Sequence, residues 1–242
     1  VHIPVILTES GLNDLVYNDF HISDHADVLI VAGCGIHNAG SDATQHSGVH
    51  TFHVGKHAKV RYVEKHYGEG EGKGSRVMNP QTIVILGEGS SFDIETVQMR
   101  GVDSTERYTK ISAGSGATAV VTEKLLTHGS QKAVSEMDVL LEGSGASARI
   151  ISRSVAQDNS EQVFHPRLEG NVQCFGHVQC DAIIMGNAKV RAIPAISANS
   201  VDAQLVHEAA IGRIAGDQIL KLMTLGLDEK QAEERILAGF LK

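Results

Sequence analysis

Two segments of the chain repeat at a fixed interval, and this repeat restricts the possible folds more than any other feature. "KISAGSGATAVVTEK" and "VLLEGSGASARIISR" share Gly-Ser-Gly-Ala, with Gly114 and Gly143 in equivalent positions 29 residues apart. A related segment, "LGEGSSFDIET", lies about one period upstream. Each unit is a turn of small residues that leads into an alternating strand, such as residues 119–121. One unit cannot bury its apolar face alone, so we expect successive units to stack.

The alternative for a chain of short strands is an antiparallel sandwich. That fold is usually rich in tight hairpins, but the sequence has no Asn-Gly or Asp-Gly turn and only four prolines. Similar turns at a nearly constant interval favour a parallel β-helix, in which like turns stack along one edge. We therefore predict a mainly β fold of this kind, with the β body over residues 1–200.

The pattern changes to that of helices after Pro194. We expect one helix capped by Asp202 and running through residues 205–214, and a second that starts at Asp217 and stops at Gly226. Asp228 and Gln231 have the spacing of a capping box and predict a third helix. Residues 201–242 are therefore predicted to form a C-terminal α-helical cap.

Composition and charge exclude several kinds of partner. The net charge of −8 argues against nucleic acid and acidic membrane surfaces. No run of 18 apolar residues predicts a membrane span, and no secretory signal pattern opens the chain. Three cysteines cannot form a closed disulfide set, so we expect reduced thiols and a cytoplasmic location.

The motifs with possible chemistry do not indicate an enzyme. "YGEGEGKGS" resembles a phosphate-binding loop, but Tyr67 replaces its first glycine and Gly74 its hydroxyl residue, so we predict no nucleotide site. No Gly-x-Ser-x-Gly motif is present. Eight of the 13 histidines lie between His21 and His66, at an irregular spacing that is more typical of surface residues than of one metal centre.

Two short segments near the C-terminus carry candidate ligands. In "QCFGHVQCD", Cys174 and Cys180 share one face of a strand and His177 the other, so the three cannot converge on one metal ion. In "QLVHEAAIG", His207 and Glu208 are adjacent and would point about 100° apart on a helix. Spacing alone favours a structural role for this last pair.

Longer stretches resemble one family. "VQCDAIIMGNAKVRAIPAISANSVDAQLVHEAAIGRIAGDQILKLMTLGLDEKQAEERILAGF" closely resembles the C-terminal half of the SufB/SufD family of iron–sulfur cluster assembly proteins. "VAGCGIHNAGSDATQHSGVHTFHVGKHAKVRYVEKH" is similar to an earlier segment of that family, and the glycine-rich middle fits more loosely. The resemblance implies a right-handed parallel β-helix, in agreement with the repeat.

The resemblance also implies a function. It indicates a non-catalytic scaffold that works with an ABC-type ATPase of the SufC kind, receives sulfur from a donor protein, and holds a transient iron–sulfur cluster. The partner subunit would be a second copy or another SufB/SufD-type chain. No nucleotide would bind to this chain.

The residues that match the family motifs are the candidate sites. Cys180 falls on the cysteine of Gln-Cys-Asp, His207 and Glu208 on the His-Glu-Ala motif, and Cys34 on the earlier Gly-Cys. Cys180, His207 and Glu208 together would be a mixed ligand set for iron, completed across a dimer interface. The alternative is an adaptor or activator of the ATPase that holds no cluster of its own.

Overall fold

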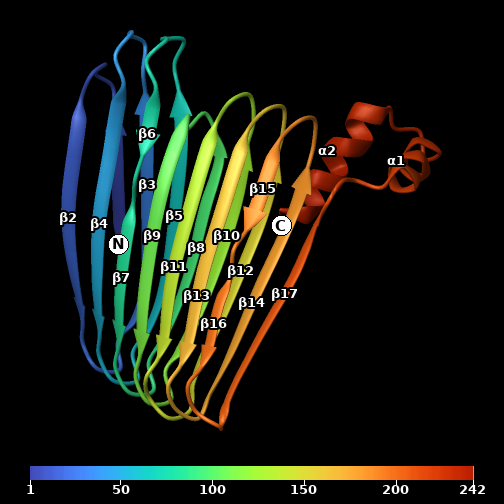
Figure 1. The fold of residues 1–242 in the computed structure, drawn as a ribbon. Helices are drawn as coiled ribbons and strands as arrows, with labels where there is room; N and C mark the ends of the chain where they lie inside the picture. Colours follow the sequence, from blue (N-terminus) through green and yellow to red (C-terminus); the bar gives the residue numbers. More distant parts are fainter. Residues whose placement is uncertain (242) are drawn as a thin grey trace.

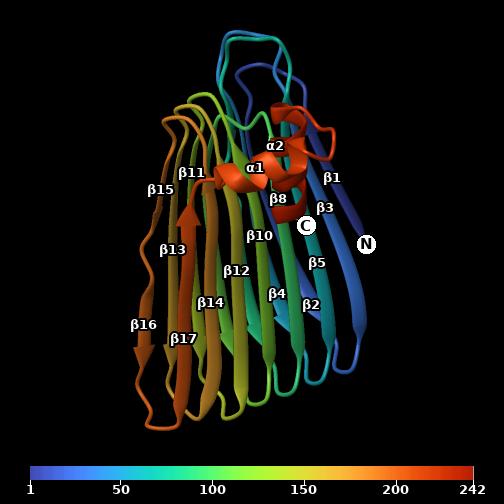
Figure 2. The same ribbon diagram turned by 90° about the vertical axis from the view of Figure 1, so that its right-hand side faces the viewer.

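The computed structural model describes residues 1–241, which form a parallel β-solenoid of about seven turns followed by two helices (Figure 1). Successive turns of the chain place strands in two sheets that face each other (Figure 2). The eight-stranded sheet has the order β1-β3-β5-β8-β10-β12-β14-β17. The nine-stranded sheet has the order β15-β13-β11-β9-β6-β4-β2, with β16 beside β13 and β7 between β4 and β9. Neighbouring strands pair in parallel, which confirms the predicted β-helix and excludes the antiparallel sandwich.

The strands of the eight-stranded sheet are β1 (His2–Leu7), β3 (Asp27–His37), β5 (Lys59–Glu69), β8 (Ser91–Arg100), β10 (Thr118–Thr127), β12 (Ala146–Ala156), β14 (Cys174–Ile184) and β17 (Ala203–Gly212). Those of the nine-stranded sheet are β2 (Asn13–Ile22), β4 (Thr44–Val54), β6 (Arg76–Met78), β7 (Gln81–Leu86), β9 (Ser104–Ala113), β11 (Lys132–Leu141), β13 (Glu161–Gly170), β15 (Lys189–Ala192) and β16 (Ala195–Ala198).

The sequence repeat corresponds to one full turn of the solenoid. Strand β10 pairs with β12 from Thr118 opposite Ser147 onward, which is the 29-residue offset of the two repeated segments. The turn residues Gly116 and Gly145 both have positive φ angles, 63° and 75°. Glycine adopts this conformation at no steric cost, so the glycine-rich turns recur where each new strand begins.

Alternate residues of each strand face the interior and stack into rows. One row crosses the eight-stranded sheet and consists of Ile30, Tyr62, Ile94, Val121, Ile150 and Val178, none more than 1% exposed. Full burial of each apolar side chain of this size contributes about 1.5–3 kcal/mol. The rows together form one continuous core that runs along the solenoid, from Ile30 to Cys180.

The predicted helix from Asp202 to residue 214 is wrong. Residues 203–212 form strand β17, which pairs with β14 over ten residues. Alanine, leucine and glutamate favour a helix in isolation. The edge of β14, however, has backbone N–H and C=O groups that need partners, and the segment can pair with them only as a strand. His207 and Glu208 therefore project from opposite faces of a strand.

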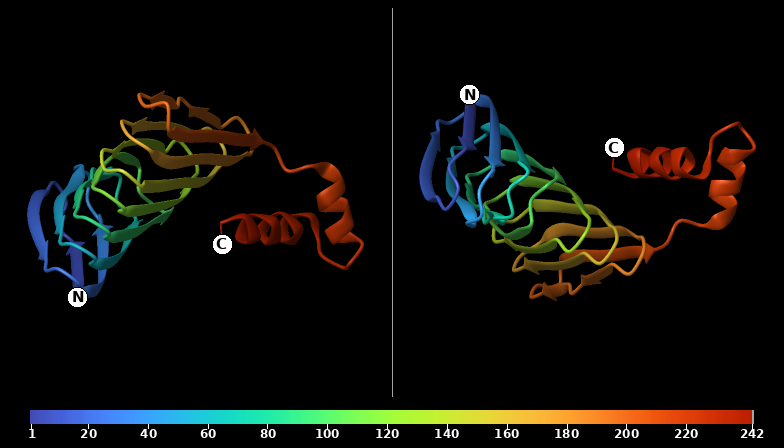
Figure 3. Two further views of the ribbon diagram at one scale, coloured as in Figure 1. Left: turned by 90° about the horizontal axis from the view of Figure 1, so that it is seen from below. Right: turned by 90° about the horizontal axis from the view of Figure 1, so that it is seen from above.

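The other two predicted helices are present. They are α1 (Gly216–Met223) and α2 (Glu229–Phe240), and the capping box of Asp228 and Gln231 starts α2. Figure 3 shows the chain leaving β17 and α2 turning back alongside the solenoid. Leu237 and Leu241 pack against Val155 of β12. In the part of the chain that the structure describes, no helix is both long and apolar enough to cross a membrane.

The segment that resembles a phosphate-binding loop has a structural role. Its alternating glycines, residues 68, 70, 72 and 74, lie against Gly101 and the backbone of residues 38–42, where a Cβ atom would overlap the neighbouring chain. Gly72 and Gly74 donate backbone hydrogen bonds to the carbonyls of Asn38 and Gly40. The glycines thus allow two loops to pack face to face.

Candidate functional site

Cys180 and His207 lie together at the C-terminal end of the solenoid. Both side chains point inward, Cys180 from β14 and His207 from β17, and the Sγ and Nε2 atoms are 3.6 Å apart. Register explains the contact, because His207 pairs with Val178, two residues before Cys180 on β14. Cys180 is buried while His207 is exposed, since β17 is the last strand of its sheet within residues 1–241. The contact forms within one chain and needs no second copy.

Burial keeps the Cys180 thiol protonated. Loss of solvent raises the pKa of Cys180 to about 12, and the negative charges of Asp181 and Glu123 add to the effect. The thiolate is the form that binds metal ions and attacks sulfur. Binding of a cation at Cys180, or a proton acceptor beside it, would therefore have to overcome this cost.

Glu208 lies on the outer face of the eight-stranded sheet. Its Oε1 atom is 3.1 Å from Nε2 of His177, which confirms that His177 faces away from Cys174 and Cys180. Cys180 and His207 are thus brought together, while Glu208 belongs to a second pair on the opposite side of the same two strands. A single ion cannot be held by all three predicted ligands of one chain in this arrangement.

Cys34 is far from Cys180. It lies on β3, five strand spacings away from β14 in the sheet order, or about 24 Å at roughly 4.8 Å per spacing. It is 3% exposed in a small cluster with Leu7, Ile36 and Met78. Burial, with the negative charge of Glu64, raises its pKa to about 12. The two thiols cannot react with each other directly.

A polar seam inside the solenoid connects the regions of the two thiols, and the sequence analysis missed it. One interior row runs Glu64, Thr96, Glu123, Ser152 and Cys180 on neighbouring strands. The side chains of this row are no more than 5% exposed. Glu64 and Glu123 keep the same alternation as their apolar neighbours, but alternation alone does not say which face of the strand is buried.

Arg107 of β9 closes the seam from the facing sheet. Its guanidinium donates to Glu64 and to Nδ1 of His66, and Tyr62 donates to the same carboxylate. Burial by itself would raise the pKa of Glu64, but His66 and Arg107 hold it well below its usual range. Glu123 accepts hydrogen bonds from Ser135 and Ser152. Buried charge is thus paired or hydrogen-bonded along the seam.

Burial also corrects the interpretation of the histidines. His46, His50 and His66 are buried, so the prediction of surface residues is wrong for these three. Burial lowers the pKa of His50 and of His66, which keeps both rings neutral near pH 7. Among residues 1–241 there is no group of three or more His, Cys, Asp or Glu side chains placed to hold one metal ion.

The seam is closely packed. A void of about 10 Å³ lies between the sheets, lined by Thr96, Gln98, Arg107, Glu123 and Ser135 among others. That volume is close to the minimum for one water molecule. Thr96 and Gln98, which line the void, have side-chain oxygens with no hydrogen-bond partner among the described residues.

The fold and this site define a parallel β-solenoid with a thiol–imidazole pair at its open C-terminal end. Residues 15–240 match the family described as "SUF system FeS cluster assembly, SufBD core domain". The chain therefore belongs to the SufBD core-domain family, as its motifs predicted.

Archaeal relatives support the assignment. An iron–sulfur cluster assembly SufBD family protein of Methanothermobacter thermautotrophicus (strain Winter) is 26% identical over 98% of this chain and 57% of its own length. The corresponding protein of strain Delta H is 27% identical over 90% of this chain and 53% of its own. A third, from Methanocaldococcus jannaschii, is 27% identical over 100% of this chain and 76% of its own. The chain thus spans little more than half of the first two relatives.

Proposed function

We propose that this chain is a non-catalytic scaffold for iron–sulfur cluster assembly in the SUF system, and that Cys180 and His207 bind the nascent cluster. The observation that carries the proposal is the 3.6 Å approach of Sγ and Nε2 at an open end of the fold. Thiolate and imidazole are both established ligand types for iron–sulfur clusters. Membership of the SufBD family supports the same function.

Two donors are too few for a complete cluster, so we infer that a second chain supplies the others. Strand β17 is the last strand of its sheet, and its free edge can pair with another strand. A second copy, or a SufB/SufD-type subunit, would bring its own donors to this edge. Glu208 would then contribute from the outer face or across the interface, rather than beside Cys180 of its own chain.

We assign the C-terminal helices to an ABC-type ATPase partner of the SufC kind. Leu220 and Leu225 are 63% and 75% exposed, and Met223 is 39% exposed, although each is apolar. A groove of about 440 Å³ between α2 and the solenoid is lined by Met99, Leu126 and Met185, among other residues. Exposed apolar side chains on α1 and the turn after it, together with an apolar groove along α2, are typical of a protein-binding surface. The ATPase would bring the nucleotide site that this chain is predicted to lack.

Cys34 is proposed as a second thiol that handles sulfur from a donor protein. Both thiols are buried: Cys180 ends the row of the polar seam, and Cys34 pairs with His66, which contacts Glu64 at the other end of that row. Because the void in the seam has a volume of only about 10 Å³, sulfur that moved between them would require side chains to shift. All three cysteines are free thiols, and we propose a cytoplasmic location in which they stay reduced.

The cluster site is tested by anaerobic reconstitution followed by visible absorbance. Cys180→Ser is expected to abolish the iron–sulfur bands and to leave the oligomeric state unchanged. Cys174→Ser is the matched control, because Cys174 lies on the same face of β14 but away from His207. His207→Ala should weaken the bands, whereas reconstitution of Cys180→Ser at the parent level would refute the site.

The ATPase surface is tested by co-purification. Removal of residues 216–242 deletes both helices, and we expect the ATPase to be lost from the complex. Because truncation also uncovers Val155, the double variant Leu220→Ser/Leu225→Ser is the sharper test, since both side chains are already exposed. Unchanged co-purification of this double variant would show that the partner binds elsewhere.

A second function is favoured by one observation. No three-donor group exists within residues 1–241, and this suits an adaptor or activator of the ATPase that holds no cluster. The two functions differ in the reconstituted spectrum. An adaptor would show no iron–sulfur bands in the parent protein under any subunit composition, yet would still raise ATPase turnover.

A further inference from the structure

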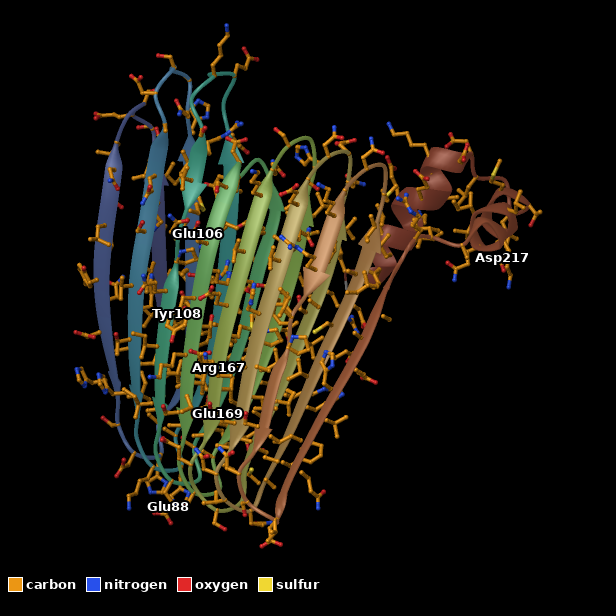
Figure 4. The ribbon with its side chains drawn as sticks, in the orientation of Figure 1. Glu88, Glu106, Tyr108, Arg167, Glu169 and Asp217 are labelled. Carbon is orange, nitrogen blue, oxygen red and sulfur yellow. The ribbon has the colours of Figure 1, made fainter. Side chains whose placement is uncertain are left out.

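Four histidines form a two-by-two array at one corner of the solenoid. His21 and His53 are register partners on β2 and β4, with parallel rings (4° between planes) whose centroids are 4.7 Å apart. His25 and His57 occupy the next turns, with rings 19° apart in plane and 5.2 Å between centroids. His57 donates its backbone N–H to the carbonyl of Glu88, which Figure 4 labels at this corner.

Later coils of the same solenoid do not carry histidine at these positions. His25 and His57 have φ angles of 61° and 55°, in the left-handed region that favours glycine. The equivalent turns of the next three coils have Gly89, Gly116 and Gly145 there. On the next two strands of the same sheet, β7 and β9, the register partners of His53 are Ile85 and then Ser112. His25 and His57 thus stand where the later coils have glycine, and His21 and His53 stand where they have Ile85 and Ser112, so within the described residues stacked imidazoles are confined to the first two coils.

We propose that each stacked pair, His21–His53 and His25–His57, binds one divalent transition-metal ion through two imidazole nitrogens. Imidazole suits Zn²⁺, Cu²⁺, Ni²⁺ and Fe²⁺. With metal–nitrogen bonds of about 2.0–2.1 Å, the two nitrogens must come within about 3.3 Å of each other. The rings of each pair are nearly parallel in the structure, at 4° and 19° between planes, so binding requires side-chain rotation that turns a nitrogen of each ring toward the shared ion.

The surroundings suit an exchangeable ion rather than a structural one. His21, His25 and His57 are exposed and His53 is half-buried, so water can fill the remaining coordination positions. Structural zinc sites have four protein ligands, whereas the residues that the structure describes contain no three-donor group. Ile85 and Leu86 border an open hollow of about 340 Å³ that His21 and His53 also line, which leaves room for a hydrated ion. The array lies at the N-terminal coils, away from Cys180, and the proposal does not depend on the proposed function.

The test is calorimetric titration of the whole chain with Ni²⁺ at pH 7.5. We expect two equivalents of binding in the parent that depend on these four histidines, apart from any ion held at Cys180 and His207. His53→Asn should weaken one by at least tenfold, and His57→Gly the other. His165→Asn is the control, because it removes an imidazole from β13 that has no ring stacked against it.

His57→Gly also separates metal binding from folding. Glycine is favoured at this φ, so the variant should keep or raise the parent's thermal midpoint while it loses one ion. Parent protein that binds no Ni²⁺ below about 1 mM would overturn the proposal. Equal binding by His53→Asn, His57→Gly and His165→Asn would do so as well, because the ions would then sit elsewhere.

Discussion

Removal of Arg107 should destabilise the solenoid more than removal of any exposed cation. Arg107 is 6% exposed and donates to Glu64, with Glu123 Oε2 3.9 Å from its Nε atom. Arg107→Met keeps most of the side-chain volume but leaves two buried carboxylates without their cation. Loss of one partner from a buried ion pair costs about 3–5 kcal/mol. For a chain of this size that is a fall in Tm of roughly 6–20 °C.

The cost of removing Arg107 should depend on pH, and the pKa of Glu64 sets the direction of that dependence. In the parent, the pKa of Glu64 is held below its ordinary value of 4.5, so its stabilising effect is present above that pH and is lost on acidification. Without Arg107, burial is opposed mainly by His66, so the pKa of Glu64 should rise from its depressed value. The destabilisation of Arg107→Met should therefore be smaller at pH 5 than at pH 8.

Urea unfolding followed by far-UV circular dichroism measures the effect, since the chain has no tryptophan. Arg61→Met is the control, because Arg61 is 63% exposed and its contact with Glu95 is 3.8 Å long. We expect a change within about 0.5 kcal/mol there. The variant Arg107→Met/Glu64→Gln/Glu123→Gln should recover much of the loss. A cost below about 1 kcal/mol for Arg107→Met at pH 8 would refute this account of the buried charges.

Three further predictions follow from single residues. The parent should lose stability as the pH falls below about 6.5, because His50 and His66 have lowered pKa values and must gain protons on unfolding. In His50→Gln the midpoint of urea unfolding should therefore depend less on pH. An identical effect of His37→Gln, at an exposed position, would contradict this prediction. Gly72→Ala should cost about 1–3 kcal/mol by thermal unfolding, because its Cβ would overlap Gly40, whereas Gly33→Ala has no neighbour within 4 Å and should be nearly neutral. The isolated chain should not bind ATP, because the loop at residues 67–75 lacks the first glycine and the hydroxyl residue of a phosphate-binding loop; micromolar affinity in calorimetry would contradict this prediction.

The fold class was predictable because each turn of the solenoid produces a repeat in the sequence. Each coil needs a tight turn at the same place, so Gly114–Ala117 and Gly143–Ala146 recur at the distance of one turn. The helix expected from Asp202 failed for the opposite reason. Its conformation is decided by the free edge of β14, which no local pattern in residues 202–214 reveals.

The candidate site was predictable only in part, since motifs identify residues but not their directions. Cys180 and His207 are 27 residues apart and meet because β14 and β17 pair in one particular register. A shift of one residue would have turned Glu208 inward and His207 outward. The family resemblance predicted one ligand set of Cys180, His207 and Glu208, but the strand geometry places Glu208 on the opposite face from the other two.

The polar seam escaped prediction because alternation alone does not say which face of a strand is inside. In β5, one face carries Tyr62, Glu64 and His66, and the other carries Val63, Lys65 and Tyr67. Both faces mix apolar and charged residues, so burial of the first set becomes evident only when Arg107 of β9 is seen opposite it. A buried charge of this kind is costly unless every member is paired. The row that ends at Cys180 contains such buried charges. The interior residues of this row should therefore be tested for a role in sulfur handling, together with the residues at the open end.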